Sequence, residues 1–483
     1  MAHRMTWEPD LKNYPHFDAA ISLKEIEALV RDPARVAANT FYPFMRYEQR
    51  WQPYRQRKND AGVAERPEKK TRPIRFASRR DAYILSYYRH LLSELYEVAL
   101  SANGLGASVI AYRKLKDADG RGKSNIDFAA DAFDVVRSLG TCAVIALDIS
   151  SFFESLDHDL LREKWCRVVG VKRLPADHEA VFRAMTRYAV VDREAVYERL
   201  GFMNRVTKAG KARFVYTRPF EKMPRKLCTN SEFRAKICGG DPTLPSLIRV
   251  NRKPYGIPQG APISDLLANV YMLDFDRTVL DYCHSHGGTY FRYSDDILMI
   301  LPGGQHEANA ARAFAVGEIT NHGTHLKIKD AKTAVGLFHQ PTGSTSLNYE
   351  HLSGRQGRNG VEYLGFRFDG VRVFVRDSTI SKLYRKVAVG VKAEVTALLK
   401  RYRGATPEQI KSRFNYSTFL QRFGRVDDFS TDSSYEEWTF WSYARRAFNR
   451  FGSAGSPIPR QLRRFKMIVR RRVEREIERR FET

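Results

Sequence analysis

The alternation of apolar and polar positions predicts a chain that mixes helices with short strands. Residues 141–148, TCAVIALD, form an apolar run that ends in an acid, as a buried strand does. Residues 289–301, TYFRYSDDILMIL, read as two apolar strands joined by a tight polar turn. Ser22, with Glu25 three residues later, predicts a capped helix start. From residue 81 to 99, apolar positions recur at helical spacing, which predicts a second helix.

The C-terminal segment from Pro459 predicts an amphipathic helix. Its apolar residues fall on one face: Leu462, Phe465, Val469, Val473 and Ile477. Much of the remaining surface is basic and includes Arg463, Arg464, Arg470 and Arg471. We expect these arginines to contact a nucleic-acid backbone.

The composition of the chain predicts a polyanionic binding partner. The 483 residues carry 81 Lys and Arg against 55 Asp and Glu, a formal net charge of +26. Such an excess favours phosphate contacts through counterion release, although a basic enzyme with scattered solvated charge is the alternative. The hydrophobic share of 43% predicts that most of the chain folds, in several subdomains.

The sequence contains no clear membrane span, signal peptide or cysteine motif. No run approaches the roughly 20 apolar residues of a spanning helix, so we expect no membrane partner. The polar N-terminus is unlike a signal peptide, and a cytoplasmic location is the default. The five cysteines are widely spaced without a Cys-x-x-Cys pair, which leaves a zinc site or disulfide framework unsupported.

Three acids are candidate magnesium ligands. Asp148 ends an apolar strand, although alone it could simply cap a turn. Asp295 and Asp296 are adjacent between apolar strands, and two carboxylates are costly to bury together without a cation. A solvated hairpin turn is the alternative. Nucleotidyl transfer uses two divalent cations held by converging carboxylates, which is what these acids could supply.

The stretch GIPQGAPISDLLANVYM predicts an irregular loop followed by a helix. Gly256, Pro258 and Gly260 force a tight backbone around Gln259, and an apolar helical run begins after Ser264. Read alone, this could be any loop before a helix.

Taken together, these stretches resemble a reverse transcriptase. ALDISSFFESLDH, GIPQGAPISDLLANVYM, FRYSDDILMI, LKIKDAKT and EYLGFRF follow the order and spacing of motifs A to E of the reverse transcriptase palm. KKTRPIRFASRRDAYIL and VIAYRK resemble the fingers motifs of prokaryotic members. The resemblance implies an α+β right-hand polymerase with a small antiparallel sheet in the palm and a helical thumb. It divides the chain into an N-terminal extension 1–64, fingers 65–140, palm 141–375, thumb 376–458 and a basic helix 459–483.

The resemblance also implies roles at the acids. Asp148 and Asp295 would be the main ligands of two Mg²⁺ ions, for which Mn²⁺ could substitute. Asp296 would lie close by, and Ile149 would add its backbone carbonyl. Lys332 matches the lysine that could protonate pyrophosphate as a general acid, with an ordinary surface lysine as the alternative.

Further roles concern the substrates. Phe153 stands where the family has a steric gate against the ribose 2′-hydroxyl, which implies deoxynucleotide substrates, and Phe152 would then be a core residue. Gln259 and Gly260 would contact the incoming nucleotide and its template base. The resemblance makes Lys70, Arg72 and, less directly, Arg75 candidates for the triphosphate. A primer grip would comprise Tyr363, Leu364 and Gly365.

The flanks suggest the subclass. They resemble the defence-associated and abortive-infection reverse transcriptases of bacteria, the unknown-group enzymes. This resemblance implies an RNA template, such as a dedicated noncoding RNA, and a DNA product made from dNTPs in antiphage defence. It leaves a partner protein or a homo-oligomer open. An intron- or retron-type enzyme and a catalytically silent RNA-binding scaffold are the alternatives.

Two departures from the family pattern stand out. Ser264-Asp265 replaces the usual Ser-Pro, which leaves the start of the following helix uncertain. The long interval from Asp148 to Gln259 indicates that the basic stretch of about 186–253 is an insertion. It could bind RNA or a second subunit, or be a solvated excursion.

Overall fold

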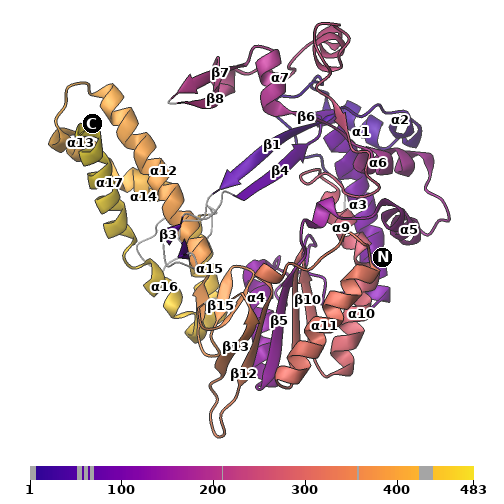
Figure 1. Ribbon diagram of the computed structural model, residues 1–483, viewed down its shortest axis with the longest axis vertical. Coiled ribbons are helices and arrows are strands. Elements are labelled where there is room, and N and C mark those ends of the chain that lie inside the picture. The colour runs from indigo at the N-terminus through magenta and orange to yellow at the C-terminus, as the bar shows by residue number, and fades with distance from the viewer. Residues whose placement is uncertain are drawn as a thin grey trace.

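The fold mixes helices with several small sheets (Figure 1). Of the 483-residue chain, the computed structural model describes residues 7–51, 57–58, 64–65, 70–208, 210–355, 358–423 and 439–482. Within these ranges, no helix is both long and apolar enough to cross a membrane.

A five-stranded antiparallel sheet lies at the centre of the fold. Its order is β10-β11-β5-β12-β13. The strands are β5 (Cys142–Asp148), β10 (Thr289–Tyr293), β11 (Asp296–Pro302), β12 (Ala334–His339) and β13 (Asn348–Gly354). The predicted strand at 141–148 and the predicted hairpin at 289–301 are therefore confirmed.

Both faces of this sheet are covered. Alternate residues of β5 enter two different cores, with Ile145 and Leu147 on one side and Cys142 and Val144 on the other. Burial on both faces explains why these strands are nearly continuous apolar runs. The first face packs against α10 (Leu273–Ser285) and α11 (Gln305–Asn321). The same core continues into the neighbouring helices α5 (His158–Val169), α6 (Ala176–Thr186) and α9 (Ser264–Tyr271). The second packs against α4 (Asn125–Leu139), β14 (Val361–Tyr363), β15 (Phe366–Phe368) and β16 (Val373–Val375).

The N-terminal helices join the first core. They are α1 (Leu23–Val30), α2 (Pro33–Ala37) and α3 (Arg79–Ala102). The predicted capping box is confirmed, because Ser22 accepts from the Glu25 N–H and Glu25 accepts from the Ser22 N–H. In α3 the helical spacing holds, but Leu95 is 38% exposed and Tyr96 is buried instead. The stripe therefore lies slightly to one side of the predicted one.

A second sheet brings the N-terminal part of the chain against the basic stretch. Its order is β4-β1-β6-β9, from β1 (Phe44–Trp51), β4 (Lys70–Phe76), β6 (Ala189–Asp192) and β9 (Arg249–Val250). Strand β1 pairs antiparallel with β4 and parallel with β6. A separate pair joins β2 (Arg57–Lys58) to β3 (Ala64–Glu65).

The basic stretch 186–253 builds a small core of its own. It contains α7 (Arg193–Arg199), β7 (Met203–Lys208), β8 (Lys211–Tyr216), α8 (Asn230–Glu232) and a π-helical turn (Phe233–Ile237). Val196, Tyr197 and Ile237 pack there with Phe17 and Met45 from the N-terminal segment. A merely solvated excursion is therefore excluded for the part that forms this core.

After β16 the described residues, 377–423 and 439–482, are mainly helical. The helices are α12 (Asp377–Arg401), α13 (Pro407–Arg413), α14 (Tyr416–Arg422), α15 (Phe440–Phe451), α16 (Pro457–Leu462) and α17 (Phe465–Phe481). The predicted single helix from 459 is wrong in its start, because the chain breaks between α16 and α17. The predicted apolar face is confirmed, since Leu462, Phe465, Val469, Val473 and Ile477 are all buried.

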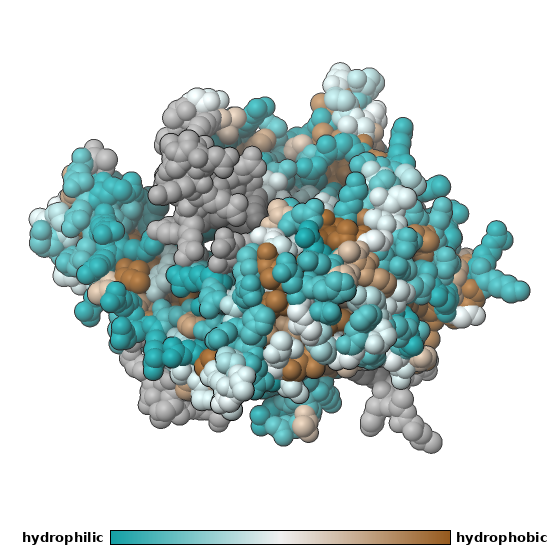
Figure 2. All heavy atoms as spheres, turned by 60° about the horizontal axis from the view of Figure 1, so that its bottom comes forward, coloured by the Kyte–Doolittle hydropathy of each residue, from teal (hydrophilic) through white to brown (hydrophobic). Residues whose placement is uncertain are grey.

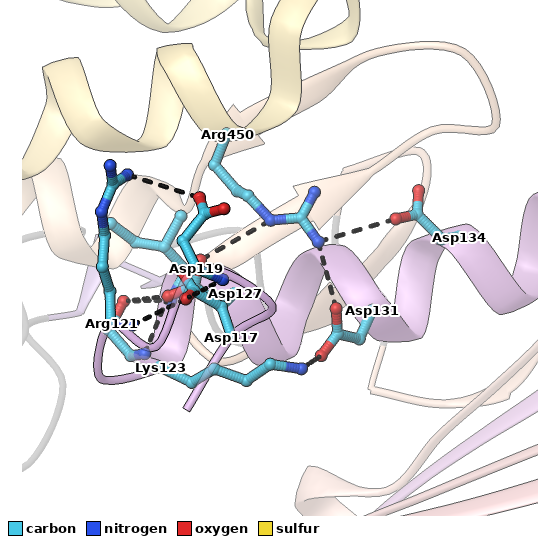
Figure 3. A network of polar contacts seen from close by, with 10 residues as sticks. Asp117, Asp119, Arg121, Lys123, Asp127, Asp131, Asp134 and Arg450 are labelled. Carbon is cyan, nitrogen blue, oxygen red and sulfur yellow. Dashed lines mark hydrogen bonds and ion pairs between the residues drawn. The ribbon is translucent and has the colours of Figure 1, made fainter. Parts of the chain in front are cut away.

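Charge contacts tie α15 to α4. The guanidinium of Arg450 reaches three acids on one face of α4, namely Asp127, Asp131 and Asp134, at 3.6, 3.1 and 3.8 Å (Figure 3). Lys123 shares Asp131 at 2.7 Å. The acids are spaced so that they lie on one side of the helix. This cluster attaches the C-terminal helices to the layer beneath the central sheet.

The face shown in Figure 2 is largely hydrophilic, with apolar residues in small separate groups. This matches a chain in which 28% of residues are charged.

Candidate nucleotidyl-transfer site

Strand register brings two of the predicted acids together. Asp148 ends β5 and Asp296 begins β11, and the two are directly paired across these antiparallel strands. Directly opposed residues project from the same face with neighbouring Cβ atoms. The two carboxylates are thus held on one face of the sheet, at one edge.

Asp295 completes the group from the turn. Tyr293 pairs with Asp296, so Ser294 and Asp295 alone form the connection between β10 and β11. Ser294 has a positive φ of 61°, a conformation that a non-glycine residue adopts at a cost. The Ile149 N–H donates to the Asp295 carbonyl at 3.0 Å, which fixes the turn to the end of β5.

Lys332 lies in the same group. Its Nζ contacts both carboxylate oxygens of Asp148 at 2.5 Å. The contact is possible because residues 327–329 run beside the end of β5, where Lys329 N–H donates to the Asp148 carbonyl at 2.8 Å. A short 3-10 turn, Asp330–Lys332, then directs the lysine inward. Lys332 is therefore not an isolated surface lysine.

Desolvation and neighbouring carboxylates both raise the pKa values of Asp295 and Asp296. Desolvation and the charge of Asp148 raise the pKa of Asp295, partly offset by Lys332. Desolvation and the charges of Asp295 and Asp148 raise the pKa of Asp296 to about 7. Because Asp296 is solvent-exposed, we attribute most of its shift to repulsion from the other two carboxylates. A bound cation would therefore stabilise the ionised carboxylate of Asp296.

The carboxylate oxygens of the three acids suit a hard divalent cation, although they do not point at one common position in this structure. Among the described residues, no three His, Cys, Asp or Glu side chains lie close enough to hold a metal ion as they stand. The cation that Asp148 contacts is the ammonium of Lys332. Carboxylate oxygens are the ligands that Mg²⁺ prefers, and their mutual repulsion here is what a cation would relieve.

The two phenylalanines after Asp148 differ as predicted. Phe152 is buried, whereas Phe153 is only partly buried at the edge of the same core. They belong to a 3-10 turn, Phe152–Glu154, that follows Ser151, which has a positive φ of 49°. The Phe153 carbonyl accepts from the Ile257 N–H at 2.7 Å. Phe153 is thus fixed between the acids and the Gln259 loop.

The Gln259 loop is tied to β4. The Gln259 carbonyl accepts from the Arg75 N–H at 2.8 Å. Gly260 has a φ of 109°, and a Cβ there would meet the Arg75 carbonyl oxygen at 2.9 Å. Glycine is therefore required by both the backbone conformation and the close approach.

On β4, the residue closest to this site is Arg75. Its guanidinium contacts Glu154, the neighbour of Phe153, at 2.9 Å and lies over the Tyr188 ring. Two of its nitrogens, Nε and Nη1, are buried without a hydrogen bond. Arg72 is exposed on the other face of the strand, and the side chain of Lys70 lies outside the described residues. Glu154 was not predicted.

A buried ion pair beneath the turn was also missed. Arg292 and Asp276 are fully buried and form two hydrogen bonds of 2.6 Å. Arg292 Nη1 also donates to the Ser294 carbonyl at 3.1 Å. The pair therefore supports the strained turn from below. The only signal in the sequence is an arginine within an apolar strand.

The predicted primer-grip turn lies beside the acids. Asp296 is one of the charges that, after desolvation, raise the pKa of the buried Tyr363 phenol. Leu364 has a φ of 44° and Gly365 a φ of 94°. Asn125 donates to the Leu364 carbonyl at 2.9 Å, which joins this turn to α4.

The Ser264-Asp265 departure has a structural reason. Helix α9 begins at Ser264, which settles the start that the sequence left open. Asp265 accepts hydrogen bonds from Arg89 of α3 at 2.8, 3.0 and 3.2 Å. An ion pair between helices therefore stands where the family usually has proline.

The arginines of the C-terminal segment do not join this site. Arg463, Arg464, Arg470 and Arg471 are exposed, and α17 packs on α12 and α13 at the side of the molecule (Figure 1). Their contact with nucleic acid stays a prediction.

No family model and no curated protein matches the chain. It is similar to the solved apo telomerase from Candida tropicalis, with 12% identity, a TM-score of 0.36, and coverage of 94% of this chain and 67% of that one. The same telomerase truncated from its C-terminal domain matches with 10% identity and a TM-score of 0.33, and the match covers 65% of this chain and 54% of that one. Candida albicans telomerase with a TWJ fragment of telomeric RNA matches with 10% identity and a TM-score of 0.35, and the match covers 94% of this chain and 66% of that one. This chain spans about half of the truncated telomerase, and at these TM-scores our proposals rest on its own residues alone.

Proposed function

We propose that this protein is an RNA-directed DNA polymerase that joins dNTPs by two-metal nucleotidyl transfer. The observation that carries the proposal is the direct pairing of Asp148 with Asp296, next to Asp295 and with Lys332 on Asp148. Two Mg²⁺ ions, when bound, would activate the primer 3′-hydroxyl and neutralise the departing pyrophosphate. Asp148, Asp295 and Asp296 would hold them, with the Ile149 carbonyl as a further ligand.

The other residues would then act on the substrates. Lys332 would give a proton to the departing pyrophosphate as a general acid, and its ammonium 2.5 Å from the proposed metal ligand Asp148 supports this role. Phe153 would exclude a 2′-hydroxyl, and Gln259 and Gly260 would contact the nucleotide and template base. Arg75 has two buried nitrogens without hydrogen bonds, which makes it a better candidate for the triphosphate than its position in the sequence alone suggested.

In this reading, residues 65–140 are the fingers, 141–375 the palm around the central sheet, and 376–458 the thumb. Tyr363, Leu364 and Gly365 would grip the primer. The template would be RNA. The resemblance of the N- and C-terminal segments to defence-associated reverse transcriptases supports a dedicated noncoding RNA in bacterial antiphage defence.

The test is to purify the full chain, sequence any RNA that comes with it, and supply dNTPs with Mg²⁺. We expect DNA complementary to that RNA, and no product in EDTA. RNA bound tightly without any metal-dependent DNA would favour a silent RNA-binding scaffold. Loss of phage protection in an Asp295→Asn strain would test the defence role separately.

A further inference from the structure

The hairpin of β7 and β8 projects from the rest of the basic stretch. It forms a two-stranded sheet of its own and extends away from α7 (Figure 1). Its base is anchored, since Met203 is 4% exposed and packs in the small core with Tyr197 and Phe202. Farther out, Val206, Phe214 and Val215 are 40%, 36% and 49% exposed. Phe220, just after the hairpin, is 44% exposed.

An isolated hairpin is only marginally stable, and side chains that stay exposed gain little from burial. The fold gives this one an anchored base and leaves its outer part open. That arrangement is typical of a contact surface rather than of a packing element.

The charge of the segment identifies the chemistry of the partner. Residues 203–226 contain eight Lys or Arg and a single acid, Glu221. Arg205, Arg213, Arg218 and Lys222 are exposed, and none forms an ion pair with another described residue. A surface with this much uncompensated positive charge is complementary to a polyanion.

The strand register mixes this charge with aromatic rings. Arg205 pairs directly with Phe214, so the guanidinium and the ring share one face of the hairpin. Tyr216, two residues along on the same face, has its ring 5.9 Å from that of Phe220. Aromatic rings that stack on bases, interleaved with cations that reach phosphates, are the means by which proteins bind unpaired strands.

We propose that the hairpin surface, made of Arg205, Arg213, Phe214, Arg218, Phe220 and Lys222, binds single-stranded RNA at a site separate from the catalytic acids. The inference rests on the proposed function, and it deepens it by assigning a segment that holds the RNA partner. Aromatic exposure favours an unpaired strand over a duplex, because the bases of a duplex are already stacked.

The test measures binding of a fluorescein-labelled 20-nucleotide oligouridine RNA to the full chain, without dNTPs. One variant removes rings (Phe214→Ala with Phe220→Ala), and a second keeps them (Phe214→Tyr with Phe220→Tyr). A third removes charge (Arg205→Gln with Arg213→Gln). The matched control removes two exposed cations elsewhere, Lys172→Gln with Arg173→Gln.

We expect the ring-removing variant to bind roughly tenfold more weakly or worse, with its salt dependence unchanged, while the tyrosine variant binds like wild type. The charge variant should lower the slope of log affinity against log salt by about 1.4, the value for two single-strand phosphate contacts. The control should match wild type. Unchanged RNA affinity in both hairpin variants would overturn the proposal, as would loss of a co-purifying protein with RNA binding intact. Because no catalysis is involved, an inactive wild type would contradict the polymerase and leave this result standing.

Discussion

Lys332 and Asp148 form an ion pair in which one ammonium nitrogen lies 2.5 Å from both oxygens of the carboxylate. The pair joins residues 184 positions apart, from the segment after α11 and the end of β5. Lys332 thereby supplies the positive charge that the acid group needs, at the oxygens that we propose as metal ligands. We therefore expect this ammonium to compete with a metal ion for Asp148.

Replacing Lys332 by methionine should raise the affinity for Mn²⁺ or Mg²⁺, because the ion no longer competes with a resident ammonium. Two unit charges about 4 Å apart in water interact by about 1 kcal/mol, so we expect roughly a fivefold effect. Calorimetric titration of wild type and variant measures it. Lys329→Met, a neighbouring exposed lysine, is the control. Equal metal affinity in Lys332→Met and wild type would show that the two cations do not compete.

Replacing Arg292 by lysine should destabilise the fold. Lysine cannot make the paired contacts with Asp276 and the bond to Ser294, and an incompletely paired buried charge costs about 3–5 kcal/mol. We expect a clearly lower melting temperature. Arg277→Lys alters an exposed ion pair with Asp281 and should change stability by about 0.5 kcal/mol or less. Similar melting of the two variants would contradict a supporting role for the buried pair.

His16 should make the protein sensitive to mild acid. Burial and the charge of Arg79 lower the pKa of His16 to about 3, from 6.5. Between these values the unfolded chain binds a proton that the folded chain refuses, so stability rises with pH there and falls on acidification below 6.5.

The measurement compares the melting temperatures of wild type and His16→Leu at pH 8 and pH 5.5. One pH unit below 6.5, the histidine costs the wild type about 1.4 kcal/mol, so the variant should lose less stability between the two buffers. Parallel losses would mean that His16 is protonated normally. Because His16 pairs with the chain near Lys226, the result also tests how firmly the N-terminal segment holds the basic stretch.

Phe153→Ala should admit ribonucleotides. The ring is partly buried and the Phe153 backbone is bonded to Ile257 near the Gln259 loop, so removal of the ring should open space at the proposed sugar position while the core persists. The ratio of dCTP to CTP incorporation should fall at least tenfold, the order of discrimination that a single contact provides. Phe152→Ala, in contrast, removes a buried ring and should cost about 3–5 kcal/mol of stability. A Phe153→Ala enzyme that still rejects CTP would refute the steric-gate assignment.

The elements around the acids could be predicted because their pattern is local. Apolar runs flanking the Ser294-Asp295 turn predicted β10 and β11, and the run before Asp148 predicted β5. The resemblance gave Lys332 a general-acid role, but its contact with Asp148 was not predicted, since nothing local to either residue indicates a partner so far along the chain.

Other features depend on contacts that leave no periodic signal. The position of Arg292 within an apolar strand hints that it is buried, but nothing near it in the sequence identifies Asp276 as its partner. The small core around the basic stretch is built from apolar residues scattered between Val191 and Ile237 and is completed by Phe17 and Met45 from the N-terminal segment, so no local periodicity indicates it. The break between α16 and α17 interrupts an apolar stripe that nevertheless stays on one face.

The most direct measurement is Mg²⁺-dependent incorporation of dNTPs on an RNA template by wild type, Asp148→Asn and Asp295→Asn. Asp330→Asn is the matched control, because this nearby acid is 82% exposed and outside the proposed ligand group. We predict DNA synthesis by wild type and Asp330→Asn, and a loss of at least a thousandfold in the other two variants with RNA binding retained. Synthesis that persists in Asp148→Asn or Asp295→Asn, or is absent from wild type, would contradict the assignment of these carboxylates to nucleotidyl transfer.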